Sequence, residues 1–143
     1  MKKSLIVFVA AFALSAGFAF LSLVTQVAIS NSGLFNSTDA FQSIFTLSSI
    51  IVDLGGLALF FAVFYFIAKK IKIQVVKSTT VALLLGVFLG SAIPYVLSIV
   101  AYHTYLAVYL SLVAGSLLSS IFRYFFPALT AMLFAELREK KSG

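Results

Sequence analysis

Four long runs of apolar residues, separated by short polar segments, dominate the sequence. A helix that crosses a bilayer needs about 20 mostly apolar residues, and the runs over residues 5–29, 44–68, 78–100 and 106–135 all reach that length. None of the runs alternates apolar and polar residues with the period of two that a membrane β-strand requires. The pattern predicts an all-α integral membrane protein, a four-helix bundle that forms one transmembrane domain over residues 1–143.

The last apolar run is longer than one crossing requires. Its residues would form a helix of about 45 Å, whereas the hydrocarbon layer is about 30 Å thick. We therefore place the fourth span at residues 113–135 and expect residues 101–112 to lie along the outer interface. Tyr102, Tyr105 and Tyr109 suit that position, because tyrosine keeps its ring in lipid and its hydroxyl in water. A strongly tilted or re-entrant helix over the whole run is the alternative.

Basic residues predict the orientation of the spans, since Lys and Arg close to span ends stay on the cytoplasmic side. They occur before the first span, between the second and third, and after the fourth: Lys2, Lys3, Lys69, Lys70, Lys72, Lys77, Arg138, Lys140 and Lys141. The other two connections contain no basic residue. The sequence therefore predicts a multi-pass protein of the cell membrane with both termini cytoplasmic (N-in/C-in). Attraction to anionic lipid headgroups accounts for the net charge of +6, so nucleic acid is not an expected partner.

The first span also resembles a secretory signal, because Lys2 and Lys3 precede its apolar run. Its length favours a retained helix, since the apolar core of a signal peptide has about 7–15 residues. Cleavage would leave three spans and place the mature N-terminus outside.

Composition excludes several kinds of chemistry. Hydrophobic residues make up 62% of the chain and charged residues 10%, with a mean hydropathy of +1.16, which is not the composition of a water-soluble domain. There is no cysteine, and His103 is the single histidine. No second metal ligand lies near His103 in the sequence, so an interfacial polar residue is favoured over a metal or proton-relay role. We expect no cofactor, no metal site and no enzymatic activity, since no catalytic constellation is recognisable.

Two charged residues, Asp53 and Arg123, fall inside predicted spans. At 1.5 Å per residue, Asp53 lies about 24 Å from Lys69 and Arg123 about 20 Å from Glu136, so the two have similar depths. Both spans run in the same direction, from outside to inside. The sequence therefore predicts that Asp53 and Arg123 can form an ion pair between the second and fourth helices.

Prolines lie close to the same level. Pro127 has no N–H to donate to the Arg123 carbonyl, and Pro94 likewise leaves the Gly90 carbonyl without its helical partner. One interpretation is a polar cavity in which Asp53 binds a proton or cation, as in transporters with broken helices. The other, which we favour, is a structural ion pair with ordinary proline kinks.

Small residues recur at every fourth position of two spans, which favours close helix packing. The third span has Ala82, Gly86 and Gly90, and the fourth run has Ser111, Gly115 and Ser119. The spacing Gly86-x-x-x-Gly90 matches the GxxxG motif, which serves equally for packing within one chain and between chains.

Short loops, small-residue stripes and the lack of catalytic groups favour a non-catalytic accessory or structural subunit. Its expected partners are other membrane subunits or further copies of itself. The alternative is a minimal ion- or proton-coupled transporter or channel that uses Asp53 and Arg123.

Overall fold

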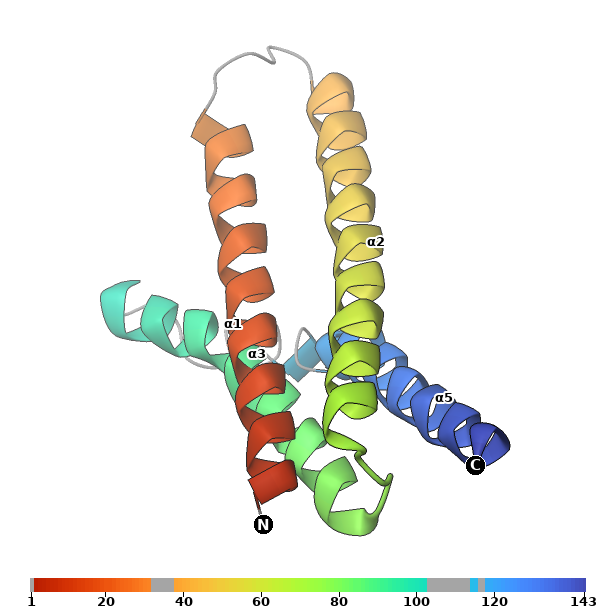
Figure 1. The fold of residues 1–143 in the computed structure, drawn as a ribbon. Helices are drawn as coiled ribbons and strands as arrows, with labels where there is room; N and C mark the ends of the chain where they lie inside the picture. The colour runs from red at the N-terminus through yellow and green to blue at the C-terminus, as the bar shows by residue number, and fades with distance from the viewer. Residues whose placement is uncertain (1, 32–37, 103–113, 116–117) are drawn as a thin grey trace.

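The computed structural model describes residues 2–31, 38–102, 114–115 and 118–143, and these residues are almost entirely helical. Residues 72–76 form a short turn at which the chain reverses direction. Figure 1 shows the elements, which are α1 (Lys2–Asn31), α2 (Thr38–Ile71), α3 (Lys77–Tyr102), the π-helical turn η1 (Ile121–Phe125) and α5 (Phe126–Ser142).

Four helical stretches of the described residues are long and apolar enough to cross a membrane. They are Lys2–Thr25, Ile50–Ile71, Lys77–Pro94 and Leu118–Ser142. The prediction of an all-α chain with four such helices is therefore confirmed.

The helices pack as two pairs rather than as an evenly packed bundle. α1 makes its most extensive contacts with α3, and α2 makes its own with α5, whereas α1 and α2 touch each other less. Figure 1 shows α1 and α2 standing side by side, with α3 crossing α1 and α5 leading away from α2. Large parts of all four helices consequently present apolar side chains to the surroundings, among them Leu5, Ile51 and Phe66.

Glycine allows the first pair to pack closely. A Cβ atom added at Gly86 would lie 2.7 Å from both the Cβ of Ala11 and the carbonyl oxygen of Phe8, and one added at Gly90 would lie 2.5 Å from the Phe12 carbonyl oxygen. The Ser15 hydroxyl, which is buried beside Gly90, donates hydrogen bonds to the Ala11 carbonyl at 2.6 Å and, across the interface, to the Gly86 carbonyl at 3.2 Å. Gly86 and Gly90 therefore pack within the chain, against the α1 backbone.

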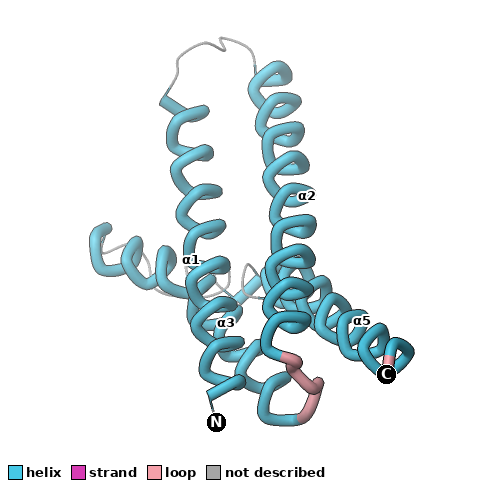
Figure 2. Tube along the Cα trace, viewed as in Figure 1, coloured by secondary structure: helices cyan, strands magenta, loops and turns pink. Residues whose placement is uncertain are grey.

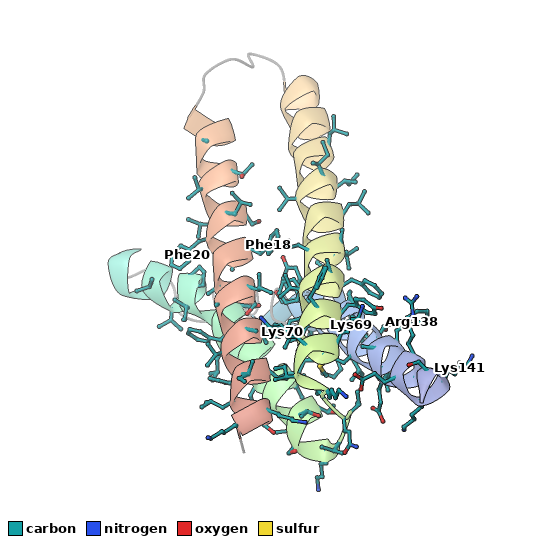
Figure 3. The ribbon with its side chains drawn as sticks, viewed as in Figure 1. Phe18, Phe20, Lys69, Lys70, Arg138 and Lys141 are labelled. Carbon is teal, nitrogen blue, oxygen red and sulfur yellow. The ribbon has the colours of Figure 1, made fainter. Side chains whose placement is uncertain are left out.

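Aromatic rings join the two pairs. The Tyr124 ring stacks on Phe60 with 4.6 Å between centroids, and Phe18 lies 5.9 Å from Tyr124 and 6.0 Å from Phe60. Gly56 makes room for this cluster, because a Cβ atom there would lie 3.1 Å from a Tyr124 ring carbon. Figure 3 shows Phe18 on the side of α1 that faces α2 and Phe20 on another side. These rings fix η1 against α1 and α2.

The turn between α2 and α3 gathers three basic segments at one end of the molecule. Lys72 has a positive φ of 49° and the Ile73 N–H bonds to the Ala68 carbonyl at 3.1 Å, which is the pattern of a Schellman helix end. Lys3 donates to the Lys72 carbonyl at 2.8 Å. Figure 2 shows this turn near the N-terminus, and Figure 3 shows Lys69 and Lys70 of α2 and Arg138 and Lys141 of α5 in the same half of the molecule.

Two connections differ from the sequence-based interpretation. Between the first two predicted spans, the polar sequence of residues 30–43 indicates a solvated turn, but its described residues are helical, since α1 continues to Asn31 and α2 begins at Thr38. An apolar run indicates only the part of a helix that lipid can cover, so it does not reveal a polar helical end beyond the membrane. The predicted interfacial segment over residues 101–112 begins within α3, which continues to Tyr102, and its other residues lie outside the described part of the chain.

Candidate functional site

The structure brings Asp53 of α2 and Arg123 of η1 into contact. Nη1 of Arg123 donates to Oδ1 of Asp53 at 2.8 Å. The pair is not enclosed, because 47% of the Arg123 side chain and 28% of the Asp53 side chain remain exposed. Both residues belong to the candidate spans Ile50–Ile71 and Leu118–Ser142. An open ion pair thus lies within helices that are otherwise apolar.

Arg123 is carried by a π-helical turn that precedes a proline. Pro127 is the second residue of α5 and cannot donate an N–H to the Arg123 carbonyl four residues earlier. A π-helix bonds residues five apart and widens the turn, and local π adjustments are one way in which helices accommodate a proline. The sequence located this break through Pro127 but did not reveal its π-helical form.

The aromatic cluster holds the turn in place beside Asp53. Tyr124, which follows Arg123, is buried between Phe18 and Phe60. Gly56, which receives the Tyr124 ring, is one helical turn after Asp53. The buried Tyr124 ring therefore holds η1 against α2, close enough for the neighbouring Arg123 to reach Asp53.

Apolar side chains flank the ion pair in the sequence and are themselves exposed. Ile50, one turn before Asp53, is 49% exposed, and Leu54, which follows it, is 60% exposed. Beside Arg123, Phe122 is 65% exposed, and Leu118 of the preceding helical residues is 59% exposed. We refer to these four residues, together with Asp53 and Arg123, as the ion-pair face.

The other predicted residues of this level lie elsewhere. Pro94 is buried in α3 and Gly90 packs against α1, so neither takes part in the Arg123–Asp53 hydrogen bond. The described contacts thus join Asp53 with Arg123 and place Gly90 in the α1–α3 interface, and the common polar cavity of Asp53, Arg123 and the two carbonyls stays a prediction.

The remaining candidates divide in two groups. Ala82 packs partly buried against the core, Ser119 is partly buried, and Gly115 has open space where a Cβ atom would stand. Tyr102 is the last residue of α3. His103, Tyr105, Tyr109 and Ser111 lie outside the described residues.

Two polar contacts were not predicted from the sequence. Ser15 bridges α1 and α3, and Glu136 of α5 accepts hydrogen bonds from the Val75 N–H at 2.8 Å and from Lys140 at 2.7 Å. A serine inside an apolar run is weak evidence for a contact between helices, because its hydroxyl commonly bonds to the backbone of its own helix. Within the described ranges, no group of three or more His, Cys, Asp or Glu side chains is placed to hold a metal ion.

No known family model matches this chain, and neither a curated protein nor a solved structure matches it significantly.

Proposed function

We propose that this chain is a multi-pass integral membrane protein that acts as a non-catalytic structural subunit, packing sideways against further membrane protein. Four apolar helices support membrane insertion. The gathering of basic segments around Lys3, Lys72 and Lys140 supports a cytoplasmic location for that end, where anionic headgroups are its lipid partners. Both termini lie at this end, so a cytoplasmic location of this end gives the N-in/C-in orientation.

The half-exposed ion pair carries the proposal. Charged groups inside a membrane face a protein interior or a water-filled cavity, because contact with hydrocarbon is costly. Arg123 and Asp53 form one mutual hydrogen bond and both reach the surface among exposed apolar residues. A second protein surface over the ion-pair face would remove the charges from lipid and give them additional hydrogen-bonding partners.

Asp53→Asn and Arg123→Gln test this function when each variant is purified from its native membrane in mild detergent. We expect the wild type to migrate as a complex and both variants to shift to the free chain. Glu139→Gln near the C-terminus is a matched control, because it also removes one charge but lies far along α5 from the ion pair. Complexes that survive both changes undiminished would contradict the proposal.

A minimal transporter or channel is the second candidate, and one observation favours it. Arg123 lies on a π-helical turn next to a proline, and such interruptions commonly occur at functional sites in membrane helices. In that case Asp53→Asn would abolish ion flux into proteoliposomes and leave the complex intact. Loss of the complex in a protein that shows no flux would support the structural subunit instead.

A further inference from the structure

We propose that the surface that covers the ion-pair face is the ion-pair face of a second copy of this chain, related to the first by a two-fold axis along the membrane normal. This inference rests on the proposed function and names its partner. Three observations support it: the common depth of the two charges, their unused hydrogen-bonding capacity and the apolar residues around them.

The two charges of the ion pair lie at nearly one depth of the membrane, because Nη1 of Arg123 and Oδ1 of Asp53 are 2.8 Å apart. A rotation about the membrane normal keeps every group at its depth. Two copies inserted in the same orientation can be related only by an axis along the membrane normal if they form a closed dimer. That operation reverses any direction within the membrane plane. Asp53 of one copy therefore faces Arg123 of the other when the two faces meet.

The charges of each copy have capacity left for this contact. A guanidinium group carries five N–H donors and a carboxylate has two oxygens, whereas the described residues supply one hydrogen bond, between Nη1 and Oδ1. Two pairs placed side by side in opposite directions form a ring of alternating charges with no net charge. A ring of this kind is self-complementary, which is what an interface between identical surfaces requires.

The apolar residues of the face complete the interface. Ile50 and Leu54 from α2, and Leu118 and Phe122 beside Arg123, are at least 49% exposed. In a two-fold interface each copy offers the same apolar rim, so the rims enclose the charged ring from both sides. The Gly86 and Gly90 stripe is not available for this purpose, because it packs against α1 of its own chain.

The absence of cysteine from the chain allows a direct test in native membranes. A Leu54→Cys variant places one thiol on the face, next to Asp53, and a short bifunctional maleimide should join two such chains to a species of twice the chain mass. Leu21→Cys is the matched control, since Leu21 is an apolar residue of α1 that is 50% exposed. We expect the Leu54→Cys yield to exceed that of Leu21→Cys by about tenfold, the ratio that about 1.4 kcal/mol of association energy produces.

Charge exchange then tests the ring itself. Asp53→Arg gives a chain with two positive charges on the face, and Arg123→Asp gives a chain with two negative charges. Each should lose the Leu54→Cys crosslink with itself. Co-expressed with different tags, the two chains should crosslink to each other at near wild-type yield, because position 53 of one faces position 123 of the other. The double variant Asp53→Arg with Arg123→Asp should crosslink with itself.

The outcomes separate this inference from the proposed function. A Leu54→Cys product of twice the chain mass, together with recovery in the mixture, supports the second copy. A product that joins Leu54→Cys to a different protein overturns the second copy and leaves the structural subunit standing. No product above the Leu21→Cys level overturns the second copy, and the proposed function is then decided by whether the wild type is still recovered as a complex from its native membrane. A mixture that pairs no better than either variant alone overturns the charged ring.

Discussion

The depths of Asp53 and Arg123 along their helices are what predicted an ion pair between them. Residue counts from Lys69 and Glu136 along the sequence place the two at similar heights. The observed Nη1–Oδ1 distance of 2.8 Å agrees with that arithmetic. Depth alone does not indicate how open the pair is, because exposure depends on which helices lie beside α2 and η1.

A double-mutant cycle measures what the ion pair contributes within the chain. We expect Asp53→Asn and Arg123→Gln each to lower the free energy of unfolding by about 1–2 kcal/mol, since each leaves one charge unpaired among apolar side chains. The double change should cost less than the sum of the two by about 1 kcal/mol, because it removes both charges. Denaturation with SDS in mixed micelles gives these values. Strictly additive losses would mean that the two residues do not interact.

Gly90 tests the close contact between α1 and α3. Gly90→Ala should destabilise the protein by about 1–3 kcal/mol, because the new methyl group would meet the Phe12 carbonyl and the Ser15 hydroxyl. Gly17→Ala in α1 is the control, since nothing lies within 4 Å of its added Cβ atom. That change should stabilise the helix by up to about 1 kcal/mol. Equal effects of the two changes in the same micelle titration would refute the packing argument.

At the level of elements, the sequence predicted which segments are helical better than where they end. The apolar runs predicted four spans, and four helical stretches of that kind are present among the described residues. The start of α2 at Thr38 was missed, because residues 38–43 are largely polar and the membrane criterion does not count them. The turn after Ile71 lies in the connection predicted between the second and third spans, but its form was not predicted, since Lys72 is an unusual residue at positive φ. A side-chain contact from the distant Lys3 and a backbone bond to Ala68 help to fix it.

Aromatic residues illustrate the same limit. Phe60, Phe61, Phe64 and Phe66 follow one another in an apolar helix, and their sequence does not say which face meets protein. The structure buries Phe60 and Phe64 and leaves Phe61 and Phe66 exposed. Phe60 stacks on Tyr124, which reaches α2 beside Gly56 one turn earlier, and Phe64 stacks on Phe60. The partner ring comes from a distant segment of the chain, so periodicity within α2 could not identify it.

Glu136 connects α5 to the turn between α2 and α3, and its removal should loosen that turn. We expect Glu136→Gln to increase hydrogen–deuterium exchange in a peptide that includes Val75, because the Val75 N–H loses its charge-assisted acceptor. The helices themselves should keep their protection. Glu139→Gln on the same helix is the control and should leave the Val75 peptide unchanged. Protection of Val75 that is the same in both variants would contradict the role of Glu136.

For the whole molecule, the arrangement of the basic segments predicts the membrane topology. Lys3, Lys72 and Glu136 are tied together through backbone and side-chain contacts at one end, and Asn31 and Thr38 lie at the far ends of α1 and α2. We expect the basic end to be cytoplasmic, because Lys and Arg near the spans are retained there.

Single cysteines in the cysteine-free chain test this topology. In intact cells a membrane-impermeant maleimide should label Thr38→Cys, whereas Gln74→Cys and Ser142→Cys should be labelled only after the membrane is opened. The start of the first span should lie on the same side of the membrane as Gln74, because Lys3 donates a hydrogen bond to the Lys72 carbonyl in the turn that contains Gln74. Labelling of Gln74→Cys and Ser142→Cys from opposite sides would exclude the proposed orientation.

The central claim is that the exposed apolar helices and the open ion pair are covered by another protein chain. Native mass spectrometry of the tagged protein, extracted from its own membrane in mild detergent, tests it most directly. The account predicts a complex of defined stoichiometry above the 15.4 kDa of one chain, lost on Asp53→Asn. A single chain that carries only lipid, in the wild type and the variant alike, would contradict it.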